Sequence, residues 1–400
     1  MIGRRRFLEV ASLGLASAGL GSAEASGQAP PSRARPKSTT GSAPEADEQV
    51  NRVLGQARTD GRRLPGMIGG IVRGEVLEKV GAVGVRKVGS PSPIRVDDLV
   101  HLGSCTKAMT ATMIGTLVDE GRLRWDSSVV EVFPEWDGSI HPAYARVTLD
   151  QLLRQRAGLP LDVAWWEVDR SWPVVEQRLA LLGSALQAAP ESAPGSKYSY
   201  SNTGYVLAGM MAERAARMPW EDLMRRRVFG PLGMTSAGFG PPGTRGLVDH
   251  AWGHKASGDL VEAVHHDNPP AMGPAGTVHG SLADWARFGS YHLTGRLGPT
   301  RLLRPETLRA LHTPRPGEEY VGGWFAVERS WAGGRALNHN GSNTYWYCVI
   351  WLAPEIDLGL LVATNAAGPP AEAACEEAIK GLVRLATAGD RPGPRPRRRG

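Results

Sequence analysis

Cysteine is scarce in this chain of 400 residues, which contains only Cys105, Cys348 and Cys375. So few thiols, in odd number, exclude a disulfide framework as the basis of the fold and leave at least one thiol free. Lysine is scarce as well, because only 7 of the 46 basic residues are lysines. What is abundant is apolar and turn-forming: 42% of residues are hydrophobic, and 50 glycines and 30 prolines are present. This composition predicts a large core in a mixed α/β enzyme with many irregular segments.

The sequence also lacks a basic central region, although its formal net charge is +6. Residues 1–44 carry a net charge of +4 and residues 391–400 carry +5, so the region between them has a net charge of −3. Nucleic-acid binding would need a positive face on the folded part, and we expect none. Residues 391–400 are predicted to form a disordered basic tail.

No apolar run is long enough to cross a bilayer. The longest near the amino terminus, residues 10–20, follows Arg4-Arg5-Arg6-Phe7-Leu8 and precedes the small residues around Ala25. This order is typical of a twin-arginine export signal, with an uncleaved membrane anchor as the alternative. We expect a signal over residues 1–25, a flexible leader over 26–44, and a mature protein that is periplasmic or extracellular with no stable membrane span.

Hydrophobic periodicity predicts strands towards both ends of the chain and helices between them. The expected strands are 67–73 and 75–88, which form a hairpin, and 321–327, 345–352 and 358–364. The expected helices are 45–61, 104–120, 147–153, 174–187, 204–216, 220–229 and 371–385, with a short one starting at a capping box over 281–284. The simplest architecture is one sheet domain over 45–390 with a helical insertion at about 125–240, and a ligand site between the two.

Ser104 and Lys107 are the most informative pair of residues. They lie one helical turn apart on one face, where a hydroxyl and an amine can share a proton. Lysine fits this role because burial can make its amine neutral, whereas a guanidinium stays charged. Two alternatives exist: Ser104 as a helix N-cap, and Cys105 as the nucleophile. Cys105 lies about 100° around the helix from Ser104, so we expect a buried structural residue there.

Two further motifs follow Ser104-Cys105-Thr106-Lys107, namely Tyr200-Ser201-Asn202 and His339-Asn340-Gly341. Each alone is weak, since His-x-Gly occurs again at His101-Leu102-Gly103. In this order the chain resembles the serine β-lactamase and penicillin-binding-protein superfamily. The resemblance is to the class C-like branch, which includes D-alanyl-D-alanine carboxypeptidases, D-aminopeptidases and lactamase-like esterases. Further segments typical of that family are 121–126, 133–136, 230–234 and 322–324.

The resemblance implies an α/β (α+β) fold in which an antiparallel sheet is flanked by helices and carries an inserted, mostly helical domain. It also implies a serine hydrolase that acts through an acyl-enzyme, with Ser104 as nucleophile and with Lys107 and Tyr200 sharing the general-base role. Asn202 would orient Lys107 and bind the substrate amide. No cofactor or metal is implied, and the partner is a small-molecule or peptide substrate.

The third motif implies the rest of the substrate site. His339 and Gly341 would lie on a strand edge, and the backbone N–H groups of Ser104 and Ser342 would form the oxyanion hole. True class C lactamases have lysine at the position of His339, and a neutral imidazole attracts a carboxylate less strongly. An ester or an amide, as in a carboxylesterase or a D-amino-acid peptidase, is therefore favoured over the alternatives of a β-lactamase or a D-alanyl-D-alanine carboxypeptidase.

A second departure lies at the start of the helical insertion, where Arg154-Gln155-Arg156-Ala157 replaces the His-Thr-Ser of many relatives. Structural roles remain open for Tyr200 as core packing, Asn202 as a turn residue and His339 as a strand histidine. The four histidines His250, His254, His265 and His266 are expected on loops and at the surface, since no carboxylate or cysteine pattern accompanies them. A non-enzymatic alternative is a penicillin-binding sensor or an inactive scaffold, against which the three intact motifs argue.

Overall fold

The computed structural model describes residues 45–59, 64–257 and 260–388. The predicted signal at 1–25, the leader at 26–44 and the tail at 391–400 lie outside the described residues. Among the helices that are described, none has the length and apolarity needed to cross a membrane.

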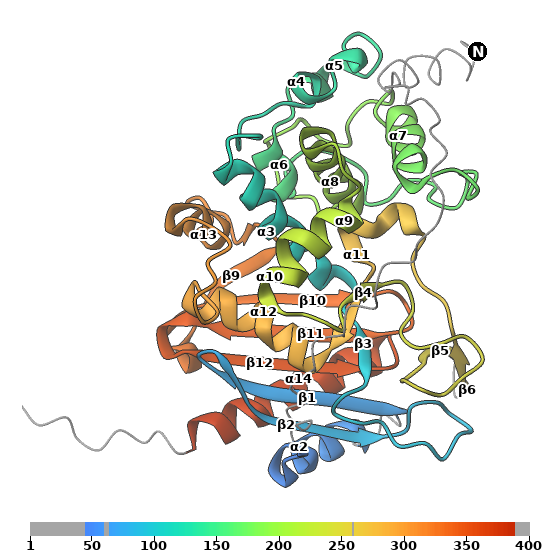
Figure 1. The fold of residues 1–400 in the computed structure, drawn as a ribbon, viewed down its shortest axis with the longest axis vertical. Helices are drawn as coiled ribbons and strands as arrows, with labels where there is room; N and C mark the ends of the chain where they lie inside the picture. Colours follow the sequence, from blue (N-terminus) through green and yellow to red (C-terminus); the bar gives the residue numbers. More distant parts are fainter. Residues whose placement is uncertain (1–44, 60–63, 258–259, 389–400) are drawn as a thin grey trace, which may run out of the picture. The chain divides into compact units, whose positions relative to one another are not determined.

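Seven antiparallel strands form the main sheet, in the order β2-β1-β12-β11-β10-β9-β8 (Figure 1). The strands are β1 (Gly66–Arg73), β2 (Val76–Gly84), β8 (Tyr320–Val321), β9 (Trp324–Arg329), β10 (Gly334–Ser342), β11 (Tyr347–Ala353) and β12 (Leu358–Thr364). Strands β1 and β2 form the predicted hairpin, and β1 pairs directly with β12, with Met67 opposite Thr364. The prediction of one antiparallel sheet built from both ends of the chain is confirmed.

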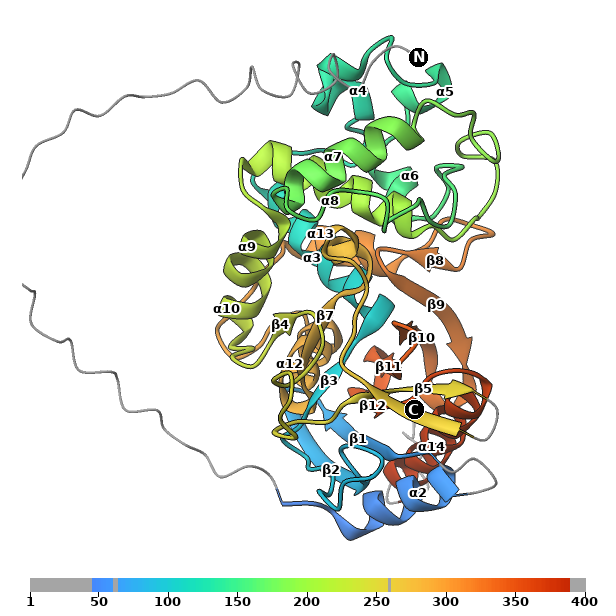
Figure 2. The same ribbon diagram turned by 90° about the vertical axis from the view of Figure 1, so that its right-hand side faces the viewer.

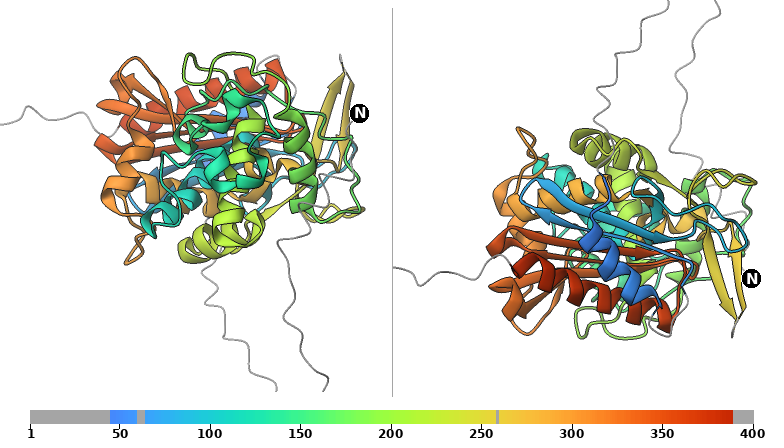
Figure 3. Two further views of the ribbon diagram at one scale, coloured as in Figure 1. Left: turned by 90° about the horizontal axis from the view of Figure 1, so that it is seen from above. Right: turned by 90° about the horizontal axis from the view of Figure 1, so that it is seen from below.

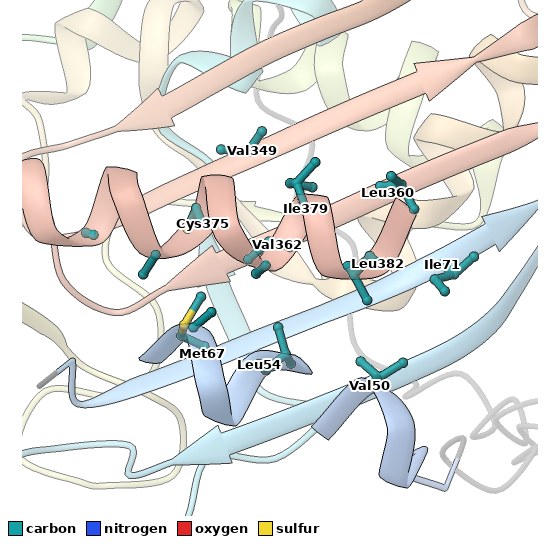
Figure 4. Close-up of a cluster of buried hydrophobic side chains, with 14 of the residues drawn as sticks. Val50, Leu54, Met67, Ile71, Val349, Leu360, Val362, Cys375, Ile379 and Leu382 are labelled. Atoms are coloured by element: carbon teal, nitrogen blue, oxygen red, sulfur yellow. The ribbon is translucent and has the colours of Figure 1, made fainter. Parts of the chain in front are cut away.

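Helices cover both faces of this sheet. On one face lie α2 (Glu48–Thr59) and α14 (Pro369–Thr387), which cross the strands side by side (Figure 3). The core beneath them is apolar, with Leu54, Leu360 and Leu382 fully buried (Figure 4). Such complete burial of aliphatic side chains is the main source of stability in this layer, at roughly 1.5–3 kcal/mol for each side chain.

Helix α12 (Leu282–Thr294) packs on the opposite face, against β1, β11 and β12. Ser281 is its N-cap and accepts a hydrogen bond from the N–H of Asp284. The predicted capping box is only half formed, because the Asp284 carboxylate accepts from Ser236. The prediction of a short helix here was wrong, because α12 has 13 residues. Its length follows from a buried stripe that includes Trp285 and Phe288, and such a stripe stabilises a helix through tertiary packing.

Two strand predictions also need correction. The single strand expected at 321–327 is two strands, because Gly322 and Gly323 both adopt positive φ, +55° and +84°, and turn the chain between β8 and β9. The strand β10 was not predicted at its full length. Its polar residues from Asn338 to Asn340 hide the alternation that marks a strand, because this segment borders the site instead of the apolar core.

Helices dominate the chain between residues 129 and 232. They are α4 (Val129–Val132), α5 (Pro142–Ala145), α6 (Leu149–Leu153), α7 (Val174–Ala185), α8 (Asn202–Ala216), α9 (Trp220–Met224) and α10 (Gly230–Leu232), with a π-helical turn η3 (Arg225–Phe229) between the last two. Those from α4 to α8 group together beyond the β8–β9 side of the sheet, whereas α10 lies next to α12 (Figure 2). Helix α3 (Thr106–Asp119) packs against this group and against α13 (Pro305–His312), since it contacts both α8 and α13.

Shorter elements complete the described chain. The strands β3 (Leu99–His101), β7 (Val278–Ser281) and β4 (Gly238–Phe239) form one small sheet, and β5 (Gly253–Ser257) pairs with β6 (Leu260–Val264). The remaining short helices are η1 (Gly103–Cys105), η2 (Pro134–Trp136), η4 (Pro270–Met272), α11 (Gly273–Gly276), η5 (Ser330–Ala332) and η6 (Pro354–Ile356). Strand β3 leads directly into η1, which carries Ser104.

Candidate active site

Two glycines bring the Ser104 segment into direct contact with β10. Gly103 adopts φ +47°, and a Cβ atom at this position would lie 2.3 Å from the backbone nitrogen of Ser342. A Cβ atom on Gly341 would lie 2.0 Å from the carbonyl oxygen of Leu102. Neither position can hold a side chain, since real Cβ contacts are longer than this. The close approach places Ser104, Gly341 and Ser342 together, as the sequence predicted.

Ser104 lies in the 3₁₀ turn η1, immediately before α3. It is half-buried, while Gly103 and Cys105 on either side are buried. The structural alternative for Ser104 fails, because Cys105 occupies the N-cap position of α3 and no side-chain cap hydrogen bond is present. Instead the Ser104 hydroxyl accepts a hydrogen bond of 3.0 Å from Lys107 Nζ.

Lys107 is fully buried, and three oxygen atoms surround its amine. Besides Ser104 Oγ, Nζ contacts Asn202 Oδ1 at 2.7 Å and the carbonyl oxygen of Ala275 at 2.8 Å. Burial lowers the pKa of Lys107 from 10.5 to about 7, although the Asp162 carboxylate opposes this shift. A large fraction of the amine is therefore neutral near pH 7, which is the state that can accept a proton from a serine hydroxyl.

Tyr200 lies close to both Lys107 and Ser104. Its ring centre lies 4.8 Å from Lys107 Nζ, and Ser104 is near enough to affect the pKa of its hydroxyl. Burial raises the pKa of the Tyr200 phenol well above 10, and the nearby Ser104 only partly offsets this. Tyr200 is therefore a neutral phenol near pH 7, able to donate a proton but poorly suited to hold a negative charge.

Asn202 connects the amine of Lys107 to a carboxylate. Its Oδ1 accepts from Lys107, and its Nδ2 donates to Asp162 Oδ1 at 3.0 Å. Asn202 is the first residue of α8, and Ser201 caps that helix by accepting from the N–H of Gly204 at 2.9 Å. The prediction that Asn202 orients Lys107 agrees with this geometry.

The segment that carries Tyr200 is held by Gln155. Gln155 is buried with φ +59°, its side-chain oxygen accepts from the N–H of Ser201, and its carbonyl accepts from the N–H of Ser199. Its neighbours Arg154 and Arg156 both form ion pairs with Glu318. The residues at 154–157 that depart from the family pattern therefore make structural contacts in this chain, and Gln155 supports the site without being recognisable from the sequence.

His339 extends from β10 at a point where the strand has lost one neighbour. The β9–β10 pairing ends at Asn338, so 339–342 form a local edge, as predicted, within a strand that is otherwise internal. The imidazole is only 3% exposed. Its Nδ1 donates to the carbonyl of Asn340, so Nε2 accepts from the Tyr320 hydroxyl at 3.2 Å.

Burial, followed by repulsion from Lys107, lowers the pKa of His339 to about 3. The imidazole is therefore neutral at every physiological pH, in agreement with the weak carboxylate attraction expected from the sequence. Its ring lies among Tyr200, Tyr320 and Phe325, with centroids about 6 Å apart. Ser342, in contrast, is exposed and lies beside the nucleophile.

The cysteines are all buried and unpaired by disulfides. Cys105 Sγ lies 3.7 Å from Cys348 Sγ and faces the sheet, with the carbonyl of His339 at 3.6 Å. Burial raises the pKa of Cys105 well above its usual value of 9.0, so this thiol is not a reactive thiolate. Cys105 is a buried structural residue, as the helical geometry predicted.

One of the histidine predictions was wrong. His254 is fully buried on β5, where Nε2 accepts from the N–H of Val88 and Nδ1 contacts the carbonyl of Asn365 at 2.6 Å. It is buried because it satisfies two backbone groups between the β5 strand and the end of β12, a contact that no local pattern encodes. His265 lies against the ring of Trp252, and His266 is exposed.

Sequence reasoning missed Asp162, Asp267 and His101. Asp162 lies in an irregular loop, and no motif distinguishes it from other surface carboxylates. His101 did carry a signal, because His101-Leu102-Gly103 repeats the weak His-x-Gly pattern directly before the nucleophile. Its side chain is fully buried and lies 2.8 Å from Asp267 Oδ1, behind Ser104.

A separate hollow of about 440 Å³ lies on another part of the molecule, between α6 and α13. Trp125, Asp150, Arg154, Leu311 and Gly322 are among its lining residues, and none of the predicted site residues is. Asp150 forms ion pairs with both Arg154 and Arg315 there, and Arg154 also pairs with Glu318, so these charges are all engaged in ion pairs. The chemistry is concentrated around Ser104 instead.

Known proteins with similar sequences belong to a family of serine hydrolases, in agreement with the arrangement of Ser104 and Lys107. The sequence profile of the Beta-lactamase family matches residues 50–383. Penicillin-binding protein 4 of Amycolatopsis lactamdurans is 28% identical over 298 residues, which make up 71% of this chain and 76% of that protein. The D-alanyl-D-alanine-carboxypeptidase/endopeptidase AmpH of Escherichia coli (strain K12) is 30% identical over 152 residues, covering 37% of this chain and 38% of that protein.

Solved structures show the same fold. A D-amino acid amidase from Ochrobactrum anthropi SV3 has a TM-score of 0.67 and 22% identity, and the match covers 85% of this chain and 97% of that one. The octameric penicillin-binding protein homologue from Pyrococcus abyssi has a TM-score of 0.68 and 23% identity, covering 84% and 77%. With the profile matching most of its length, this chain belongs to the Beta-lactamase family and is a serine hydrolase.

Proposed function

We propose that the protein hydrolyses esters and D-amino-acid amides or peptides through an acyl-enzyme on Ser104. The observation that carries the proposal is the 3.0 Å contact between Ser104 Oγ and an amine whose pKa burial lowers to about 7. A neutral amine at hydrogen-bond distance is what a serine needs to become a nucleophile at physiological pH.

In the acylation step, Ser104 Oγ bonds to the substrate carbonyl carbon while its proton passes to Lys107. The carbonyl oxygen becomes an oxyanion, which the backbone N–H groups of Ser104 and Ser342 stabilise. Collapse of this intermediate breaks the bond to the leaving group, which takes a proton delivered through Lys107 and Tyr200. Water then attacks the ester carbonyl, and Ser104 regains its proton as the acid is released. Asn202 orients Lys107 and bonds the substrate amide, and Gly341 lets the segment that carries Ser104 approach β10.

Charges near the nucleophile support this substrate class. His339 is neutral where a cation would hold a substrate carboxylate, and the Asp162 carboxylate reaches the site through Asn202. A negative charge here repels a second carboxylate and attracts an ammonium group. Amino-acid amides with a free amino group, and uncharged esters, are therefore better substrates than carboxylate-bearing β-lactams or peptides ending in D-alanine.

Labelling and substrate profiling test the proposal separately. A fluorophosphonate probe should add one label to the wild-type protein, on the tryptic peptide that contains Ser104. The Ser104→Ala protein should remain unlabelled, while Cys105→Ala should label normally. A label that persists in Ser104→Ala would refute the nucleophile.

For the substrate class, kcat/KM is compared on p-nitrophenyl butyrate, D-alanine p-nitroanilide and a chromogenic cephalosporin. The first two should exceed the cephalosporin by about tenfold or more, which corresponds to about 1.4 kcal/mol of transition-state stabilisation. A preference for the cephalosporin by two orders of magnitude would instead make the protein a β-lactamase.

The chain is proposed to reach the periplasm or the exterior through a twin-arginine signal at residues 1–25. Replacing Arg4, Arg5 and Arg6 by lysine should retain the precursor in the cytoplasm, since the pathway reads guanidinium groups. Amino-terminal sequencing of the secreted protein should begin near Ser26. A secreted form that still contains Met1 would contradict cleavage.

A further inference from the structure

A buried contact between a histidine and a carboxylate, next to the Ser104 segment, has no part in the acylation chemistry above. His101 is fully buried, and its Nδ1 accepts a hydrogen bond of 3.0 Å from the N–H of Gly103. Its proton is therefore on Nε2, which lies 2.8 Å from Asp267 Oδ1. The Asp267 side chain is only 4% exposed, so its charge is removed from water beside the nucleophile.

The same carboxylate oxygen also reaches β10 through Asn343. Asp267 Oδ1 accepts from Asn343 Nδ2 at 2.9 Å. Asn343 is buried directly after Ser342, and its own Oδ1 accepts from the N–H groups of Tyr345 and Trp346, which fixes the turn after β10. One oxygen of Asp267 thus contacts both halves of the site, through His101 to Gly103 and through Asn343 to Ser342.

Asp267 is itself anchored to the Lys107 side of the site. Its Oδ1 accepts from the N–H of Asn268 at 2.7 Å, and Asn268 Nδ2 donates to the carbonyl of Gly276 at 2.7 Å. The residue before Gly276 is Ala275, whose carbonyl accepts from Lys107. Because Asp267 Oδ1 contacts His101, Asn268 and Asn343, it holds these three segments in fixed positions relative to one another.

We propose that Asp267 is a positioning residue, which sets the separation of the Ser104 and Ser342 backbone N–H groups through His101 and Asn343. This rests on the proposed role of those two groups as the oxyanion hole. The donors of such a hole must lie 2.7–3.1 Å from the oxyanion, and losing one typically lowers kcat by about 10²–10³-fold. Burying a carboxylate costs free energy of folding. The positioning of the two oxyanion-hole segments is the functional gain that accompanies this cost.

The Asp267→Asn protein tests the proposal, with Glu213→Gln as a matched control. Glu213 is also a buried carboxylate, which pairs with Arg178, but it lies at the far end of α8. Asp267→Asn should lower kcat on p-nitrophenyl butyrate about 10- to 100-fold with KM within about twofold. It should weaken inhibition by phenylboronic acid, whose adduct on Ser104 carries a tetrahedral anion, by a similar factor. Glu213→Gln should lower the melting temperature but leave kcat and boronate affinity close to wild type.

Two substitutions of His101 test each link if Asp267→Asn does not fold. Asparagine places an acceptor near the position of Nδ1 and so retains the bond to Gly103, whereas glutamine places a donor near Nε2 and retains the contact with Asp267. Both His101→Asn and His101→Gln should show the loss in kcat and in boronate affinity, because each breaks one link. Unchanged kcat and boronate affinity in these variants, while the wild type still labels on Ser104, would overturn the positioning role. Failure of the wild type itself to label would instead remove the proposed function.

Discussion

Two regions of this molecule bury their side chains by different means. Beneath α2 and α14 the buried atoms are hydrocarbon, and residues such as Leu54 and Leu360 need only be excluded from water. Where η1, α8 and β10 meet, the buried side chains are polar: Lys107, His101 and Asn343 each depend on named partners. Loss of a side chain should therefore cost mainly stability in the first region and mainly chemistry in the second.

The largest effect is expected for Ser104→Ala, which removes the nucleophile and nothing else that the fold needs. Turnover of p-nitrophenyl butyrate should fall by about 10⁴-fold or more. The melting temperature should stay close to wild type, because alanine is a good helix former and Ser104 is not an N-cap. Steady-state kinetics and thermal unfolding on one preparation check both points. A large loss of stability would mean that the two regions do not differ in this way.

Lys107→Arg should be nearly as damaging, by about 10²–10⁴-fold in kcat. A guanidinium keeps its proton at any accessible pH and cannot accept one from Ser104. Lys380→Arg is the matched control, since Lys380 is exposed on α14 and pairs with Glu376, and it should keep full activity. If Lys107→Arg retained a tenth of the wild-type rate, Lys107 would not be the base.

In the apolar region, Leu360→Ala should lower the free energy of unfolding by about 2–5 kcal/mol, because it leaves a cavity in a close-packed layer. At temperatures where the variant is folded, kcat should equal that of the wild type. Urea unfolding measures the first quantity and initial rates the second. Val76→Ala serves as the control, because Val76 is 61% exposed and its truncation should change stability by less than about 0.5 kcal/mol. A lower kcat in the folded Leu360→Ala protein would mean that packing in the apolar region also affects the chemistry of the active site.

The smallest expected effect is a change in pH dependence. The amine of Lys107 must be neutral to act, so kcat/KM should rise with pH through about 7. The Asp162 carboxylate raises the pKa of Lys107 by stabilising the ammonium form, so Asp162→Asn should lower that pKa. The acidic limb of the profile should then shift to lower pH. The matched control is Asp97→Asn, which removes an exposed carboxylate and should leave the profile unchanged. A limb that moves to higher pH in Asp162→Asn would contradict the assignment of this limb to Lys107.

Much of the site was predictable because its chemistry depends on spacing along the chain. A serine and a lysine three residues apart meet on any helix, so Ser104 and Lys107 are paired by local geometry alone. The same holds for the cap at Ser281 and the stripe of α2 that buries Val50, Leu54 and Ala57. The role of Lys107 as a base was predictable from its residue type, since lysine can lose its proton and arginine cannot.

Other features follow only from contacts between distant segments. The pKa of Lys107 depends on burial against Asn202 and Ala275, and the neutral state of His339 depends on its enclosure beside Tyr320. The positions of Asp162, Asp267 and Gln155 could not be predicted, because each acts on a segment more than 40 residues away in the chain or lies in a loop without a motif.

The sequence by itself therefore predicted the reaction type, since its three motifs, in their order, resemble those of a family of serine hydrolases and helical spacing pairs Ser104 with Lys107. The tertiary structure decided what tunes that serine: which groups are withdrawn from water, which carboxylate acts on the amine, and how the Ser104 and Ser342 segments are held together. The physical reason is that desolvation and Coulomb interactions depend on distance in space, and only the folded chain sets those distances.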